Sequence, residues 1–136
     1  MNLNDKLIIA VDFDGTIVED EYPSIGKPIM FAFETLKKLQ KEGHRLILWT
    51  YRYGKTLEDA VTFCEKNGVF FYAVNNSFPE EQYDTDRSRK IHADLFIDDR
   101  NFGGFVGWGE IYQMLIGSTE NLSVENKKKG FFDFFK

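Results

Sequence analysis

The chain contains little cysteine, no excess of basic charge and no long apolar segment. Its single cysteine, Cys64, excludes an internal disulfide and lies at helical apolar spacing, which predicts a buried thiol. The formal net charge of −5 argues against a broad surface for DNA or RNA. No segment approaches the roughly 20 apolar residues of a membrane span, so no transmembrane segment is predicted.

No secretory signal peptide is expected in the N-terminal residues. Residues 1–6 are polar, and no apolar signal core follows a basic start. We therefore expect a cytoplasmic protein, and one free thiol is typical of a reducing compartment. His44 and His92 have no partner at the spacing of a metal site or a catalytic triad, so both are predicted to be structural.

Short apolar segments alternate along the chain with amphipathic ones. Strands are predicted at residues 7–11, 45–50, 69–74 and 95–97, and helices at 28–39, 56–64 and 108–115. This alternation predicts an α/β fold of three layers: a doubly wound parallel sheet with helices on both faces. A domain at 1–116 is expected, followed at 117–136 by a polar linker and a Phe-rich tail.

Local signals predict where the helices begin and end. Pro28 suits the first turn of the first helix, and Gly43 stands where a left-handed cap would close it. Thr56 with Asp59 resembles a capping box at the start of the second helix, which Gly68 would end. Residues 75–90 are polar and are predicted to form a loop with a short helical turn.

Acidic and hydroxyl side chains lie at or just past the carboxyl ends of three predicted strands: Asp12 and Asp14, Thr50, and Asp98 and Asp99. Ligands of doubly wound sheets bind at the carboxyl ends of the strands, near the point where the strand order reverses. These side chains are therefore expected to meet in one crevice.

Four converging carboxylates repel one another and raise each other's pKa. An ordinary turn would explain one acid after a strand, but it explains two pairs of acids less well. A divalent cation relieves the repulsion, and oxygen-only ligands favour Mg²⁺ over zinc. Such a site suits phosphoryl transfer, with a carboxylate as nucleophile and a second as proton donor and acceptor. Thr50 and Lys90 are available as donors to the phosphoryl oxygens.

Four segments resemble the motifs of the haloacid dehalogenase superfamily. They are "DFDGT" at 12–16, "LILWT" ending in Thr50, "RK" ending at Lys90 and "LFIDD" at 95–99. The resemblance spans about residues 7–116 and implies a Rossmann-like core of the small capless type. The activity that it implies is that of a hydrolase, a Mg²⁺-dependent phosphatase that cleaves a phosphate monoester through an aspartyl-phosphate.

The resemblance also implies a role for each matching residue. Asp12 would be the nucleophile and a metal ligand, and Asp14 the general acid and base, with its backbone carbonyl on the metal. Thr50 would hydrogen-bond the phosphoryl group.

Two further motifs complete the implied site. Lys90 would hold the nucleophile and the phosphate. Asp98 and Asp99 would bind Mg²⁺, and which of the two contacts the ion directly is left open.

A cap domain is not expected, because residues 17–27 and 51–89 are too short to hold one. An open site implies a large substrate or a neighbouring subunit as lid, so a homo-oligomer is expected. The candidate substrate contacts are Tyr51, Arg52 and Arg100, because each directly follows a motif. Arg52 is expected to bind a carboxylate or phosphate through a bidentate contact, and the alternative is a surface arginine. Both a small phosphorylated metabolite and a phosphorylated macromolecule fit this description.

The C-terminal "KKKGFFDFFK", residues 127–136, holds four of the fourteen phenylalanines of the chain. Exposed apolar clusters tend to acquire a partner. The tail would dock on its own domain or a sister subunit, form a short linear motif for another protein, or contact a membrane surface through its lysines; a disordered end is the fourth alternative.

Two rival functions use the same fold. A receiver-like phospho-signalling module is also small and acidic, but its phosphoacceptor follows the third strand, where this chain has Asn75 and Asn76. A non-catalytic interaction protein would have no use for the intact pair Asp12 and Asp14.

Overall fold

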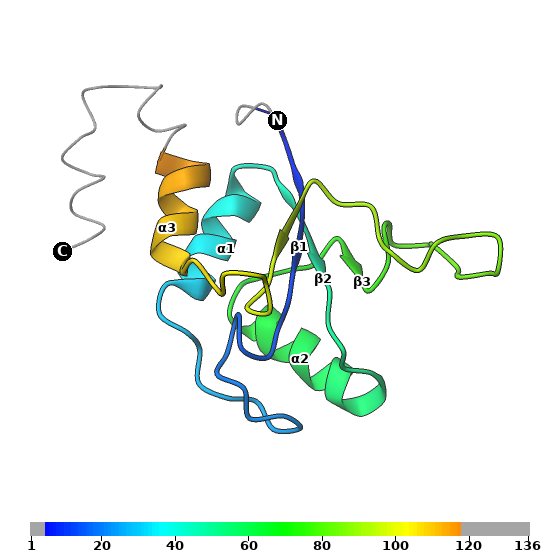
Figure 1. The fold of residues 1–136 in the computed structure, drawn as a ribbon. Helices are drawn as coiled ribbons and strands as arrows, with labels where there is room; N and C mark the ends of the chain where they lie inside the picture. Colours follow the sequence, from blue (N-terminus) through cyan, green and yellow to red (C-terminus); the bar gives the residue numbers. More distant parts are fainter. Residues whose placement is uncertain (1–4, 118–136) are drawn as a thin grey trace.

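The structure is a computed structural model that describes residues 5–117. Its centre is a sheet of four parallel strands, β1 (Ile8–Val11), β2 (Arg45–Leu48), β3 (Ala73–Val74) and β4 (Leu95–Ile97), in the order β3-β2-β1-β4 (Figure 1). The helices are α1 (Ala32–Lys41), α2 (Gly54–Lys66) and α3 (Trp108–Tyr112), which continues as the π-helix η1 (Gln113–Gly117). The predicted α/β class with a parallel Rossmann-like sheet is confirmed.

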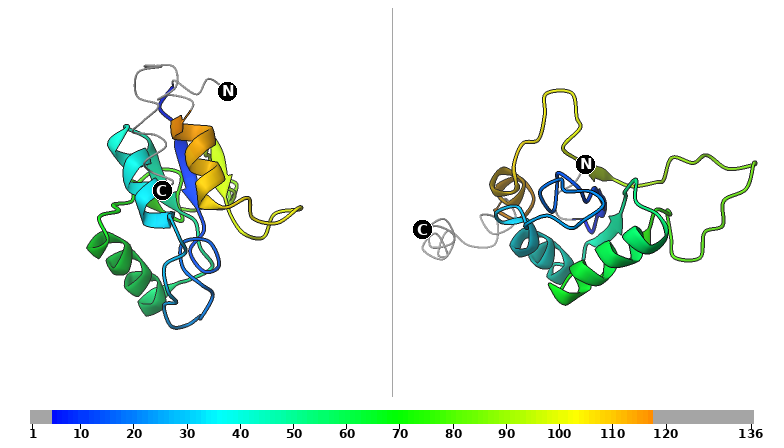
Figure 2. Two further views of the ribbon diagram at one scale, coloured as in Figure 1. Left: turned by 90° about the vertical axis from the view of Figure 1, so that its left-hand side faces the viewer. Right: turned by 90° about the horizontal axis from the view of Figure 1, so that it is seen from below.

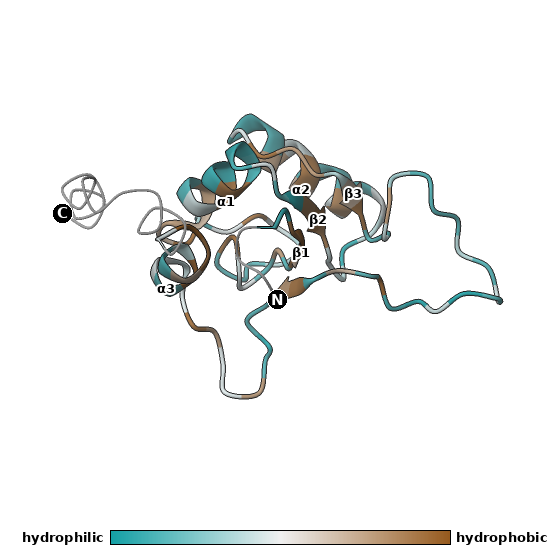
Figure 3. Cartoon of the chain, turned by 90° about the horizontal axis from the view of Figure 1, so that it is seen from above, coloured by the Kyte–Doolittle hydropathy of each residue, from teal (hydrophilic) through white to brown (hydrophobic). Residues whose placement is uncertain are grey.

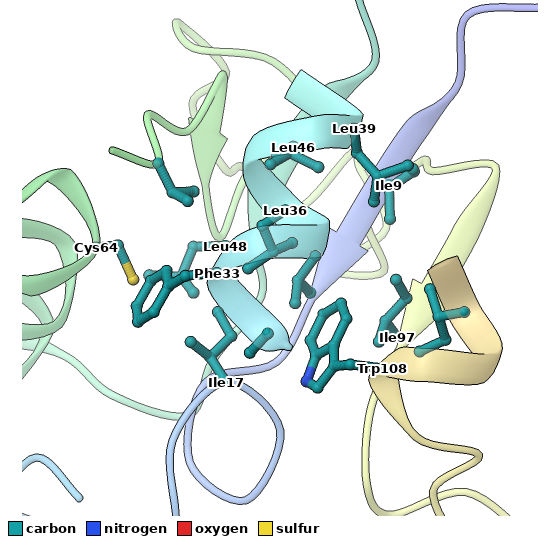
Figure 4. Packing of buried hydrophobic residues seen from close by; sticks show 14 of the residues in the cluster. Ile9, Ile17, Phe33, Leu36, Leu39, Leu46, Leu48, Cys64, Ile97 and Trp108 are labelled. Carbon is teal, nitrogen blue, oxygen red and sulfur yellow. The ribbon is translucent and has the colours of Figure 1, made fainter. Parts of the chain in front are cut away.

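All three helices cover the same face of the sheet (Figure 2, Figure 3). The core on this face joins strand and helix side chains, among them Ile9, Leu36, Leu39, Leu46, Leu48, Cys64, Ile97 and Trp108 (Figure 4). Each fully buried aliphatic side chain of this kind stabilises the fold by about 1.5–3 kcal/mol. Cys64 is buried as predicted, and burial raises the pKa of its thiol to about 12.

The opposite face of the sheet carries a smaller apolar cluster of Ala10, Ile47, Ala73 and Ile91. Ile91 belongs to the segment 75–94, which connects β3 to β4 and contains no helix. The second helical layer predicted for this face is therefore replaced, in the described part of the chain, by a loop. Most of this loop is too polar to offer a helix an apolar side, and Figure 3 shows it as largely hydrophilic.

Two predicted helix starts are wrong. α1 begins at Ala32 because Pro28 is engaged earlier: it forms an antiparallel bridge with Val18, and the Ile29 N–H donates to the Ile17 carbonyl at 2.9 Å. α2 begins at Gly54, and the Thr56 hydroxyl donates to the Tyr53 carbonyl at 2.8 Å instead of capping the helix.

The ends of α1 and α2 agree with the predictions from the sequence. Gly43 and Gly68 follow α1 and α2 at φ +96° and +86°, as left-handed caps require. The third strand is shorter than predicted, because only Ala73 and Val74 pair with β2. Within residues 5–117, no helix combines the length and the apolar character needed to cross a bilayer.

Candidate functional site

The sheet register brings the first and fourth acidic motifs together. Val11 of β1 is paired with both Leu48 and Ile97, so Asp12 and Asp98 leave the sheet at the same level on neighbouring strands. The Asp12 N–H still donates to the Ile97 carbonyl at 2.9 Å. Parallel strands that end together thus place two acids from distant parts of the chain side by side.

Three carboxylates form a cluster at this edge. Asp12, Asp98 and Asp99 each offer an oxygen, and these oxygens lie within 4.8 Å of one another. All three residues are half-buried. Such a cluster could bind a metal ion, because a cation can contact several ligand oxygens at this spacing.

Thr16 connects the two acidic motifs. Its hydroxyl oxygen lies 2.9 Å from Asp12 Oδ2 and 3.1 Å from Asp99 Oδ1, and it accepts the Asp99 backbone N–H at 3.0 Å. The Thr16 carbonyl in turn accepts the indole N–H of Trp108 at 2.7 Å. Because a hydroxyl has one hydrogen, it can donate to only one of the two carboxylates at a time.

Gly15 permits the close approach of Asp99. Its φ of +88° is a left-handed conformation, and a Cβ at this position would lie 2.5 Å from Asp99 Oδ2. Any larger residue would be strained and would push the Asp99 carboxylate away. The glycine in "DFDGT" therefore shapes the acidic cluster.

The cluster holds a proton more tightly than an isolated aspartate. Burial, hydrogen bonding with Asp99 and the charge of Asp98 raise the pKa of Asp12 from 3.8 to about 7, against the opposing effect of the Thr16 hydroxyl. The cause is physical: a carboxylate that is removed from water beside other carboxylates is costly to ionise. A bound cation would reverse this cost.

Asp14 does not join the cluster through its side chain. Arg52 donates from Nε to Asp14 Oδ2 at 2.8 Å and from Nη2 to Oδ1 at 2.7 Å. This bidentate contact raises the pKa of Arg52. Both oxygens of the predicted general acid therefore accept hydrogen bonds from within the protein.

The structure corrects the predicted role of Arg52 as a substrate contact. The residue is 1% exposed, and its remaining donors bind the carbonyls of Pro23, Ser24 and Thr56. Arg52 does make a bidentate contact with a carboxylate, but the carboxylate is that of Asp14. It is therefore not free to bind substrate, and it is not a surface arginine.

A pocket of about 640 Å³ opens above the cluster. Its lining comprises Asp12, Asp14, Asp20, Tyr22, Trp49, Thr50, Tyr51, Asp98 and Arg100. The Thr50 hydroxyl accepts the Arg52 backbone N–H at 3.2 Å, and the Thr50 N–H donates to Asn75 Oδ1 at 2.8 Å. The pocket thus contains the predicted residues Asp12, Asp14, Thr50, Tyr51, Asp98 and Arg100.

Lys90 is placed elsewhere. It is exposed, its ammonium lies 6.0 Å from the centre of the Phe96 ring, and it is not part of the pocket lining. β4 is an edge strand and its Phe96 is 40% exposed, so a side chain that lies over this ring is at the surface of the protein. The expected contact of Lys90 with the nucleophile is therefore absent from this arrangement of residues 5–117.

Sequence reasoning missed the roles of Thr16, Trp49 and Asn75. Thr16 is part of the quoted motif, but nothing in its spacing indicated a bridge to Asp99. Asn75 could have been found, since it is a polar residue directly after a predicted strand. Trp49 follows β2 and lines the pocket, although the apolar pattern alone marks it as core.

Comparison with known proteins yields one informative likeness. No family model matches the chain, and no curated protein gives a significant match. A solved structure of a conserved protein from Bacteroides thetaiotaomicron is 55% identical, with a TM-score of 0.78, over 84% of this chain and 93% of that one. This chain belongs to the family of that conserved protein. At this identity and coverage, members of the family share the fold described above.

Proposed function

We propose that the chain is a Mg²⁺-dependent phosphatase that hydrolyses a phosphate monoester through an aspartyl-phosphate on Asp12. The observation that supports this most is the cluster of Asp12, Asp98 and Asp99 carboxylates, two of which, Asp12 and Asp98, line an open pocket. Hydroxyl and guanidinium groups of Thr50 and Arg100 line the same pocket. The resemblance of the surrounding motifs to the haloacid dehalogenase superfamily points to the same reaction.

The donor set fits magnesium. All the candidate ligand atoms are oxygens, and neither His nor Cys lies in the cluster, which favours a hard cation over zinc. Asp12, Asp98 and Asp99 would hold the ion, which would supply charge neutralisation to the phosphoryl oxygens. Burial and the neighbouring acids raise the pKa of Asp12 to about 7, and a bound cation would favour its ionised form.

In the proposed reaction, a carboxylate oxygen of Asp12 attacks phosphorus and the bond to the ester oxygen breaks. The leaving oxygen takes a proton and departs as an alcohol. Water then attacks the aspartyl-phosphate, giving inorganic phosphate and restoring the Asp12 carboxylate. Water is the co-reactant, and the phosphorus keeps its oxidation state throughout, so no oxidant is needed.

Asp14 is the proposed proton donor and acceptor. Arg52 donates one hydrogen bond to each of its oxygens, so a second lone pair on each oxygen stays available to the leaving oxygen or to water in the pocket. Arg52 therefore positions the group that moves the proton, and does not itself contact the substrate.

Thr50 and Arg100 are the proposed donors to the transferred group. Because Thr50 Oγ1 accepts the Arg52 backbone N–H, its own hydrogen remains available to a phosphoryl oxygen. Arg100 follows Asp99 directly, and its guanidinium carries the fixed positive charge that a transferring phosphate requires. We propose that the protein works in the cytoplasm with an open, capless site.

Turnover of p-nitrophenyl phosphate tests the proposal. Wild type should release phosphate with Mg²⁺ and lose activity in EDTA, and Asp12→Asn should lower kcat/KM at least about a thousand-fold, since it removes the nucleophile. Asp59→Asn, the same change on the exposed side of α2, is the matched control and should keep wild-type activity. Turnover that survives in Asp12→Asn contradicts the proposed intermediate.

The rival functions give a different result in the same assay. A receiver-like module or a non-catalytic interaction protein would show no turnover above that of Asp12→Asn. If wild type does turn over p-nitrophenyl phosphate, a phosphate-release screen over a panel of metabolites, run with Mg²⁺ and with EDTA, would identify its substrate.

A further inference from the structure

A second pocket of about 290 Å³ adjoins the acidic one. The two pockets share Trp49 and Thr50, so these residues form the boundary between them. The rest of the second lining comes from the loop after β3: Asn75, Asn76, Glu81, Tyr83, Arg87, Ser88 and Arg89. A ligand held by Thr50 over the acidic cluster can therefore extend over Trp49 toward this loop.

The charges of the two pockets are opposite. Acids line the first pocket, whereas two arginines and one glutamate line the second. Arg87 forms ion pairs at 3.9 Å with Glu81 Oε2 and with Asp84 Oδ2, and both distances are longer than a hydrogen bond. Unlike Arg52, it is half-exposed and can exchange these long pairs for a ligand. With two arginines against one glutamate in its lining, the second pocket carries a formal excess of one positive charge.

Arg89 contributes in a second way. Its guanidinium lies over the Tyr83 ring, 4.6 Å from the ring centre, so that the flat cation is held against the aromatic wall of the pocket. Stacking of this kind orients the N–H groups of an arginine without using them. They remain suited to the oxygens of a phosphate.

Aromatic surface lies between the two charged regions. Trp49 lines both pockets, and Tyr51 and Tyr22, which line the first, are 90% and 45% exposed. Exposed aromatic side chains beside a phosphate site are well suited to stack on a planar ring, as they do on nucleic acid bases.

We infer that the site binds a nucleotide with two phosphates, one above the acidic cluster and the other at Arg87 and Arg89, with its base against Trp49. The inference rests on the proposed function, because it assigns the first phosphate to the Asp12 centre. The volumes of the two pockets are of the order expected for a small-molecule site, about 300–1,000 Å³. The net charge of −5 opposes a long polynucleotide, so the ligand is a small nucleotide.

Calorimetry on the full chain tests the second subsite without chemistry. Asp12→Asn in Mg²⁺ is titrated with adenosine 3′,5′-bisphosphate, adenosine 5′-monophosphate and ribose 5-phosphate. We expect the bisphosphate to bind at least tenfold more tightly than the monophosphate, and the monophosphate more tightly than the sugar phosphate. When Arg87→Ala and Arg89→Ala are introduced into the Asp12→Asn variant, the bisphosphate should bind less than about threefold more tightly than the monophosphate.

Lys41→Ala with Lys66→Ala is the matched control, because it removes the same charge from exposed residues in the last turns of α1 and α2. It should retain the tenfold preference. Equal binding of bisphosphate and monophosphate, or loss of the preference in the control as well, overturns the inference. If adenosine 5′-monophosphate binds no more tightly than ribose 5-phosphate, the placement of the base against Trp49 is wrong.

Turnover of p-nitrophenyl phosphate tests the proposed function independently of the binding measurements. If p-nitrophenyl phosphate is turned over but the bisphosphate has no advantage, the phosphatase stands and the second subsite is wrong. If the arginine-dependent preference is present and nothing is hydrolysed, the subsite stands and the phosphatase is wrong.

Discussion

The guanidinium of Arg52 has five N–H donors, and all five meet acceptors within the protein. Two bind the Asp14 carboxylate, and three bind the carbonyls of Pro23, Ser24 and Thr56. One buried side chain thus connects the loop after β1, the segment 23–24 and the first turn of α2. Its removal would leave several polar groups without a partner.

Arg52→Met should therefore destabilise the protein by about 3–5 kcal/mol, since breaking a buried pair leaves an uncompensated charge. Arg52→Lys, which retains the charge but not the fork, should cost less. Urea unfolding of Arg52→Met, Asp14→Asn and the double variant would measure the coupling. Purely additive effects would show that the two side chains do not stabilise each other.

Thr16 is a second residue whose hydroxyl serves several partners. Thr16→Val keeps the shape but leaves the Asp99 N–H without its acceptor, so we expect a loss of about 1–3 kcal/mol. The apparent affinity for Mg²⁺ should fall as well, because Asp12 and Asp99 are no longer held together. Thr16→Ser keeps the hydroxyl and should behave nearly as wild type in both urea unfolding and magnesium titration.

At the scale of elements, the carboxyl ends of β1 and β4 create the electrostatics of the site. The folded protein keeps a proton on Asp12 up to about pH 7, whereas the unfolded chain releases it near pH 3.8. Between these values the native state binds more protons than the unfolded state, so the free energy of unfolding falls as the pH rises from about 4 to about 7.

Magnesium should oppose this loss, because it binds the ionised cluster. We expect Mg²⁺ to raise the Tm more at pH 7.5 than at pH 5, and EDTA to abolish the difference. Asp12→Asn, which cannot titrate at this position, should show a flatter Tm profile without metal between pH 4 and 7. A wild-type Tm that rises over this range relative to Asp12→Asn would contradict the assigned pKa shift.

At the scale of the whole molecule, the two faces of the sheet differ. Three helices cover one face, and the 75–94 loop crosses the other, where Phe96 is 40% exposed. Residues 118–136, with the predicted Phe-rich tail, lie outside the described part of the chain. Their predicted docking on a sister subunit or on another protein is therefore a question for solution experiments.

We expect the full chain to be a homo-oligomer, and we expect deletion of 118–136 to lower its mass if the tail joins subunits. Light scattering coupled to gel filtration would measure both forms at several concentrations. Replacing only the four phenylalanines of residues 131–135 by alanine separates an apolar contact from the effect of length. An unchanged mass removes the subunit-docking hypothesis.

Much of the candidate site was predictable from local pattern. An apolar run followed by acids identifies the end of a buried strand, and parallel strands end at one edge of the sheet. From these two facts the proximity of Asp12, Asp98 and Asp99 could be expected. The caps at Gly43 and Gly68 are equally local, since each depends on one residue and the turn before it.

The sequence by itself determined the strands, their parallel arrangement and the edge at which the acids gather, because hydrophobic periodicity and capping act between near neighbours. Only the tertiary structure decided that Arg52 binds Asp14 and that Thr16 contacts Asp99. These contacts join residues 38 and 83 positions apart. Their geometry follows from how the whole chain packs, and no local pattern encodes it.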